Sequence, residues 1–177
     1  FFSTRIGVVK RTFVTAFENI RSNGLIAIGL KEDDELVNVL KTTGSDVMII
    51  GTHTGNSVTF QEEAVRDMGR TAAGVRGVRL RADDYVIGAA IIREGDEVLV
   101  ITEKGYGKRT LGSAYPIKGR GGKGIKTANI TEKNGPLAGL TTVSGKEDIL
   151  LITDKGIMIR FHAASVSQTG RATLGVR

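Results

Sequence analysis

The chain has 177 residues, 40% of them hydrophobic, which is enough to bury the core of one ordinary domain or of a short array of smaller units. It contains no cysteine, which excludes a disulfide framework and thiolate metal sites and is compatible with the cytoplasm. Its 25 Lys and Arg residues against 19 Asp and Glu residues give a net charge of +6, which favours an acidic partner, and its strand-sized apolar runs exclude a transmembrane helix.

Four hairpin-like segments follow one another along the chain. Each consists of an apolar run, a polar turn that contains glycine, and a second run. They are "FFSTRIGVVKRT", "MIIGTHTGNSVTF", "VLVITEKGYGKRT" and "ILLITDKGIMIRF", with turn glycines Gly7, Gly55, Gly105 and Gly156. These glycines are 48, 50 and 51 residues apart. A period of this size with strand-like contents predicts a propeller or a related β array, in which no unit can bury its faces alone.

The same period recurs downstream of the last three hairpins. Fifteen residues after the turn glycine come the register arginines, Arg70, Arg120 and Arg171, and nineteen residues after it come the register glycines, Gly74, Gly124 and Gly175. The first repeat has Arg21 and Gly24 instead. Helical periodicity is weak, and at most one short helical turn is expected, near "FQEEAVRDM". The sequence therefore predicts an all-β fold with approximate repeats 1–47, 48–97 and 98–148 and an incomplete repeat 149–177.

The two histidines offer no candidate site. His53 lies two residues before its turn glycine and His162 six residues after its own, and the other repeats have unrelated residue types at both positions. We interpret both histidines as incidental and not as a metal pair or a general base. The sequence contains no catalytic constellation and no metal site.

The segment "KGRGGKG", residues 118–124, combines four glycines with three cations. It lies in a stretch from Lys104 to Lys126 that has seven cations and no acid, so the rest of the chain is close to neutral. Residues 119–124 match G-x-G-x-x-G, but the dinucleotide fingerprint requires a helix to follow, and "IKTANIT" is β-branched without a helical stripe. The phosphate-loop pattern also fails, because Ile125 occupies the position of its lysine. Nucleotide binding is therefore disfavoured.

Two other interpretations of this loop remain. Gly124 recurs in register, which indicates a tight crossing between adjacent repeats. Gly121 and Gly122 do not recur, and together with Gly119 they favour a clamp for a phosphate backbone. In such a clamp glycines expose backbone N–H groups while cations neutralise charge; the cations here are Lys118, Arg120 and Lys123.

These residues resemble a known family. "KGRGGKG", the preceding "GYGKRTLGSAY", and the stretches "GRTAAGVRGVRL" and "GRATLGVR" are similar to the C-terminal domain of the A subunit of DNA gyrase, over essentially the whole chain. The family signature, the GyrA box, reads Q-[RK]-R-G-G-[RK]-G. Residues 120–124 match its last five positions, whereas Lys118 and Gly119 depart from the first two. The resemblance implies a degenerate copy of the box here, and we expect the stronger box upstream of this chain.

The resemblance also implies a fold and a function. The family forms a β-pinwheel, a disc of usually six propeller-like blades with exchanged strands, so about four blades here imply an open arc or a fragment. Duplex DNA wraps on its basic rim, which gives gyrase its handed strand passage and negative supercoiling. The implied partners are DNA, the gyrase B subunit, and the remainder of the A subunit, in an A2B2 enzyme of the bacterial cytoplasm, with no membrane. This domain would hold no cofactor, and the ATP and Mg of the enzyme would act elsewhere.

One loop is not expected to bend DNA alone, because bending by about 40–90° over roughly 20–30 bp costs about 1–6 kcal/mol. We therefore predict a rim of cations. The predicted DNA-binding residues are Lys10, Arg11, Arg21, Arg70, Arg76, Lys108, Arg109, Lys118, Gly119, Arg120, Gly121, Gly122, Lys123, Gly124, Lys126, Arg160 and Arg171. Aromatic residues make up only 5%, which favours duplex over single-stranded DNA. The alternatives are the equivalent domain of topoisomerase IV, which usually lacks a recognisable box, and a propeller for protein recognition.

Overall fold

The computed structural model describes all 177 residues, and its regular elements are β-strands and short 3-10 turns. The all-β prediction is confirmed. The four hairpins are antiparallel and consist of β1 (Phe2–Thr4) with β2 (Val8–Lys10), β4 (Val47–Thr52) with β5 (Asn56–Gln61), β8 (Glu97–Thr102) with β9 (Gly107–Leu111), and β12 (Asp148–Ile152) with β13 (Met158–His162).

All four hairpin turns share the pattern Thr-x-x-Gly, in which the threonine is as regular as the glycine. The turns are Thr4–Gly7, Thr52–Gly55, Thr102–Gly105 and Thr153–Gly156. Each glycine has φ between 77° and 88°, a conformation that costs little only for glycine. Its N–H donates to the threonine carbonyl at 2.9–3.0 Å, and the threonine hydroxyl accepts the next N–H at 3.0–3.4 Å. The turn chemistry therefore explains why threonine and glycine recur at these positions in every repeat.

Each of the first three hairpins is widened by segments from later in the chain. On the first strand of the hairpin, β3 (Leu36–Val39), β7 (Val86–Ile92) and β11 (Leu137–Val143) pair with β1, β4 and β8. On the second strand, β6 (Val75–Arg76) pairs with β2, β10 (Ile125–Lys126) with β5, and Val176 bridges to Gly107. These last partners come from the following repeat. We call the resulting sheets blades 1 to 4, in the order of their hairpins, and neighbouring blades exchange strands.

The hydrophobic core lies between the blades. Met48 and Ile50 on β4 pack towards blade 1, whereas Ile49 between them packs towards blade 3. All three are fully buried. A strand covered on both faces needs apolar residues at successive positions, which explains the continuous run "VMII" in place of alternation.

Four 3-10 turns follow the hairpin strands: η1 (Val14–Phe17), η2 (Glu62–Ala64), η3 (Gly112–Ala114) and η4 (Ala163–Ser165). The expectation of at most one such turn was therefore too low. The last three lie at the same place in each repeat, where the second strand of the hairpin ends. Glycine, serine and alanine at these positions have no helical periodicity, so only η2 was visible in the sequence.

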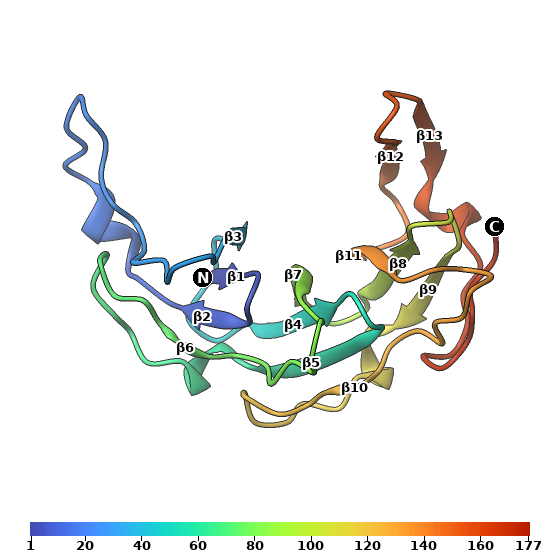
Figure 1. Ribbon diagram of the computed structural model, residues 1–177, viewed down its shortest axis with the longest axis horizontal. Helices are drawn as coiled ribbons and strands as arrows, with labels where there is room; N and C mark the ends of the chain where they lie inside the picture. The colour runs from blue at the N-terminus through green and yellow to red at the C-terminus, as the bar shows by residue number, and fades with distance from the viewer.

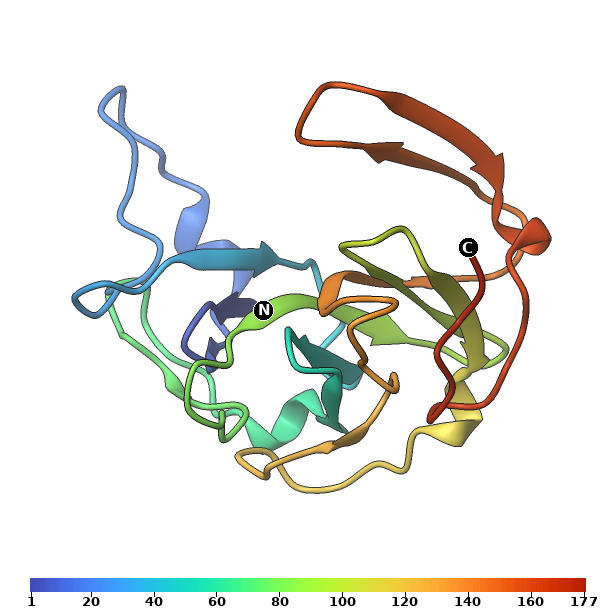
Figure 2. The same ribbon diagram turned by 45° about the vertical axis from the view of Figure 1, so that its right-hand side comes forward.

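The blades follow one another along a curved row, with β6 and β10 on its outer side (Figure 1). Hairpin β12–β13 extends from the other blades in both views (Figure 2). This hairpin is a two-stranded sheet, and five of its apolar side chains are 51–62% exposed: Leu150, Ile152, Ile157, Met158 and Ile159. No helix of the structure is long and apolar enough to cross a membrane.

Candidate nucleic-acid interface

Three equivalent loops lie beside the exchanged strands. We call residues 69–74, 119–124 and 170–175 the rim loops; each begins with glycine and a register arginine and ends with a register glycine. The register glycines have φ of 106°, 77° and 84°. A Cβ atom on them would lie 2.4 Å from the Val9 oxygen, 2.6 Å from the Ser57 oxygen and 2.9 Å from the Gly107 oxygen. The interpretation of Gly124 as a tight crossing is confirmed.

Replacing Gly124 with alanine is expected to destabilise the protein by about 2–4 kcal/mol, because the residue would be strained at positive φ and would collide with the Ser57 carbonyl. Gly119→Ala is the matched control, since Gly119 has ordinary φ and open space around its Cβ position. We expect that control to stay within about 0.5 kcal/mol of the parent in urea unfolding. Equal losses for both variants would contradict the crossing.

The register arginines connect consecutive repeats in the same way. The Nη1 atoms of Arg70, Arg120 and Arg171 donate to the carbonyls of Ile26, Arg76 and Lys126 at 3.2, 3.0 and 2.9 Å. Each arginine therefore fixes its rim loop to the short strand, or strand-equivalent segment, of the preceding repeat. Because a guanidinium has five N–H donors, it keeps donors for an external anion.

The loop of the degenerate box, residues 118–124, is anchored at its centre and exposed at its ends. The Nε atom of Arg120 donates to the Ala64 carbonyl at 2.8 Å, and the N–H of Gly121 donates to the Gly77 carbonyl at 2.6 Å. Lys118 and Lys123 are exposed, and their ammonium groups have no partner in the protein. The N–H groups of Gly119, Arg120, Gly122 and Lys123 also lack an acceptor in the protein. The loop thus presents free backbone donors between free cations.

Two predicted rim cations are buried, and their prediction as exposed rim residues is wrong. Lys10 is 0% exposed and Lys108 is 1% exposed. A rim loop of the next repeat covers both side chains. On β9, Lys108 alternates with less buried residues, whereas all three residues of β2 are buried. Burial lowers the pKa of Lys10, and it lowers the pKa of Lys108 to about 8, with a smaller contribution from the nearby Arg171.

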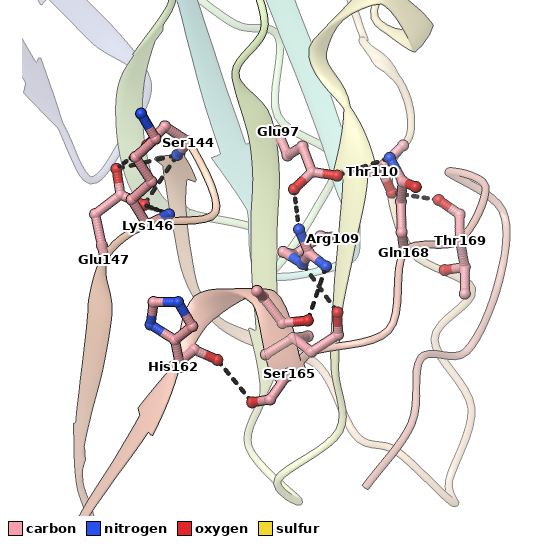
Figure 3. A network of polar contacts seen from close by, with 12 residues as sticks. Glu97, Arg109, Thr110, Ser144, Lys146, Glu147, His162, Ser165, Gln168 and Thr169 are labelled. Carbon is pink, nitrogen blue, oxygen red and sulfur yellow. Dashed lines mark hydrogen bonds and ion pairs between the residues drawn. The ribbon is translucent and has the colours of Figure 1, made fainter.

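The neighbouring predicted arginines, Arg11 and Arg109, are partly exposed and are also engaged inside the protein. Arg11 pairs with Asp67, with 3.1 Å between Nε and Oδ1, and its Nη1 atom donates to the Gly44 carbonyl at 3.1 Å. Arg109 forms an ion pair with Glu97 and donates from Nε to the Val166 carbonyl at 2.9 Å (Figure 3). Both arginines join one blade to the next.

The remaining predicted cations differ in whether they lie beside the rim loops. Arg21, Arg76 and Lys126 are exposed, and Arg76 and Lys126 lie on β6 and β10 beside the rim loops. Arg160 is exposed on β13 but forms an ion pair with Asp148, away from the rim loops. Sequence reasoning missed Arg79, an exposed cation whose N–H donates to the Gly122 carbonyl at 2.8 Å. Its position five residues after a register glycine was the available signal.

The histidines lie apart and have unrelated contacts. The ring of His53 stacks on Tyr85 with centroids 4.3 Å apart, and its Nδ1 atom is 3.2 Å from the Leu137 carbonyl oxygen. His162 contacts Asp148 through Nδ1 at 3.1 Å. The structure contains no group of three or more His, Cys, Asp or Glu side chains that could hold a metal ion.

Comparison with known proteins identifies the family. A family model described as "DNA gyrase C-terminal domain, beta-propeller" matches residues 1–43, 46–93, 96–144 and 147–177. This chain belongs to the DNA gyrase C-terminal domain family. It is 50% identical over 178 aligned residues to the DNA gyrase A subunit of Staphylococcus epidermidis and 49% identical to that of Staphylococcus aureus. Each alignment covers 99% of this chain and 20% of the relative, so the chain spans about a fifth of those subunits.

Solved structures agree with this gyrase assignment at the level of fold. The C-terminal domain of DNA topoisomerase IV superposes with a TM-score of 0.93 and the DNA gyrase A C-terminal domain with 0.87, each at 27% identity. Both matches cover 99% of this chain, and they cover 55% and 59% of the solved chains. Equal identity to the two domains does not separate gyrase from topoisomerase IV, whereas the 50% identity to gyrase A subunits favours gyrase.

Proposed function

We propose that this gyrase-family domain binds and bends duplex DNA along the outer side of its row of blades, without reading sequence. The observation that carries the proposal is the repetition of the rim loops. Each one places a register arginine, held by the preceding repeat, at the same position beside an exchanged strand. Repeated contacts at regular steps on a curved surface suit a uniform polyanion, because phosphates repeat regularly along the duplex whatever the base sequence.

The expected bending of the DNA depends on the number of phosphate contacts along the curved row of blades. A bend of about 40–90° over roughly 20–30 bp costs about 1–6 kcal/mol, and several phosphate contacts along the arc offset that free energy. The rim cations that remain available are Arg21, Arg70, Arg76, Lys118, Arg120, Lys123, Lys126 and Arg171. Backbone contacts without base contacts make the binding sensitive to salt and insensitive to sequence.

In the parent enzyme, the bent DNA would be presented to the catalytic core with a fixed handedness, which would yield negative supercoils. We propose that this domain is not itself catalytic, that strand cleavage and ATP hydrolysis occur in other parts of a gyrase made of A and B subunits, and that the enzyme acts in the bacterial cytoplasm. Support comes from the relatives, which are gyrase A subunits five times the length of this chain.

The proposal is tested by titrating two unrelated duplexes at several salt concentrations, with donor and acceptor dyes on the duplex ends. We expect equal affinities, a linear fall of log affinity with log salt, and energy transfer that rises as the DNA bends. Each phosphate contact contributes about 0.9 to the slope. Binding that ignores salt, or binding of proteins only, would instead favour a protein-recognition propeller.

A further inference from the structure

Two of the three rim loops lie directly over a buried lysine of the neighbouring blade. Lys10 and Lys108 occupy the same position, three residues after their turn glycines. The Nζ atom of Lys10 donates to the carbonyls of Ala27 at 2.5 Å, Gly69 at 3.1 Å, and Arg70. The Nζ atom of Lys108 donates to the carbonyls of Gly170 at 2.7 Å and Arg171 at 2.5 Å, and to the Thr173 hydroxyl at 3.1 Å.

Neither lysine has a carboxylate partner within 4.0 Å. The charged groups near them are also cations: the register arginines Arg70 and Arg171 and, for Lys10, the Phe1 amino group. The Phe2 ring lies 5.1 Å from the Lys10 ammonium. Burying an ammonium group is unfavourable unless dipoles replace its hydration. Here the loop carbonyls supply those dipoles, so each buried charge fixes the orientation of two peptide groups.

The inward carbonyls determine where the N–H groups of these peptides point. All peptide bonds are trans, and a trans peptide directs its N–H away from its carbonyl. Carbonyls of Gly69 and Arg70 that point at Lys10 therefore direct the N–H groups of Arg70 and Thr71 away from it. The N–H groups of Arg171 and Ala172 are related to Lys108 in the same way. None of these four N–H groups has an acceptor in the protein.

The third rim loop, residues 119–124, has no buried lysine beneath it. Val58 occupies the position of the buried lysines, and a small cavity of about 50 Å³ lined by Val58 and Gly119 lies beneath this loop. The loop instead has its own exposed cations, Lys118 and Lys123, which the other two loops lack. Every rim loop therefore has a positive charge in addition to that of its register arginine. In two loops a buried lysine beneath the loop supplies it, and in the third the lysines of the loop itself supply it.

We propose that residues 69–72 and 170–173 are two further phosphate-binding sites, in which the N–H groups of Arg70, Thr71, Arg171 and Ala172 donate to DNA phosphate oxygens. Lys10 and Lys108 do not touch DNA. They are positioning residues that hold the peptide groups outward and add a fixed positive field behind them. This inference rests on the proposed duplex binding, and it adds backbone N–H contacts in two rim loops to the side-chain contacts proposed above.

The test follows backbone amide resonances by 15N NMR while a mixed-sequence duplex is added. In the parent protein, the amides of Arg70, Thr71, Arg171 and Ala172 should shift together with those of the box loop. In the double variant Lys10→Met, Lys108→Met, these four shifts should disappear while the box amides still respond. Affinity should fall about 10- to 100-fold, as expected for roughly two lost contacts. The control pair Lys31→Met, Lys133→Met removes two exposed lysines and should retain all four shifts.

The outcomes separate this inference from the proposed function. If no amide responds and no duplex binds, the proposed function itself is wrong. If the box amides respond in the parent protein but the four amides do not, the two further sites are overturned while DNA binding stands. That comparison needs only the parent protein, so it holds even where a lysine variant fails to fold. Four shifts that persist in the double variant would show that the buried lysines have no positioning role.

Discussion

Replacing Lys118 and Lys123 with alanine is expected to weaken duplex binding about 10- to 100-fold near 0.1 M salt, since roughly two phosphate contacts are lost. The magnitude of the salt slope should fall by up to about 1.8, and the DNA should bend less. Both side chains are exposed and unpaired, so the free energy of unfolding should change by no more than about 0.5 kcal/mol. Titration at several salt concentrations with dye-labelled duplex ends measures affinity, slope and bending, and urea unfolding measures stability.

The matched control is Lys133→Ala with Lys155→Ala, which removes the same charge from exposed turns outside the rim loops. An equal loss in the control pair would show that net charge, and not the loop, determines binding. Arg120→Ala should behave differently from both pairs. Its guanidinium donates to the carbonyls of Ala64 and Arg76, so removing it also releases the loop and lowers stability by about 1–3 kcal/mol.

Raising the pH from 8 to about 10 is expected to stabilise the folded protein. Lys108 has a pKa of about 8 in the folded chain, because burial disfavours its charge, against 10.5 when unfolded. Between these values the unfolded chain binds more protons, so the free energy of unfolding rises with pH. The full difference corresponds to about 3 kcal/mol. Lys10 shifts in the same direction, whereas the raised pKa of Tyr115 acts oppositely above pH 10.

Urea unfolding of the parent protein and of Lys108→Met at pH 7, 8, 9 and 10 measures this effect. The slope should be shallower in the variant, because Lys108 no longer titrates, while Lys10 and the Phe1 amino group, whose pKa values burial also lowers, still contribute in both proteins. Duplex affinity at constant ionic strength should fall over the same pH range in the parent protein, since the positive field behind residues 170–173 is lost. If the free energy of unfolding rises with pH as steeply in the variant as in the parent protein, Lys108 does not lose its proton near pH 8.

The sequence by itself determined the repeating plan of this protein. Glycine at positive φ and threonine three residues earlier are required by the local turn, so the four hairpins and their period are visible without a structure. The register arginines and glycines were visible because every repeat makes the same contacts with the repeat before it, although these contacts join residues far apart in the chain. The all-β class and the crossing at Gly124 followed directly.

Only the tertiary structure decided which cations belong to the rim. Lys10 and Lys108 are cations, which are usually exposed. The alternation of side chains along a strand predicts that the strand has two faces, but it does not show which face another segment covers. The covering loops lie about 60 residues further along the chain, so local pattern contains no information on their burial. The sequence held one indication of this difference. Val58 replaces the buried lysine in one repeat, and only in that repeat does the rim loop have lysines of its own.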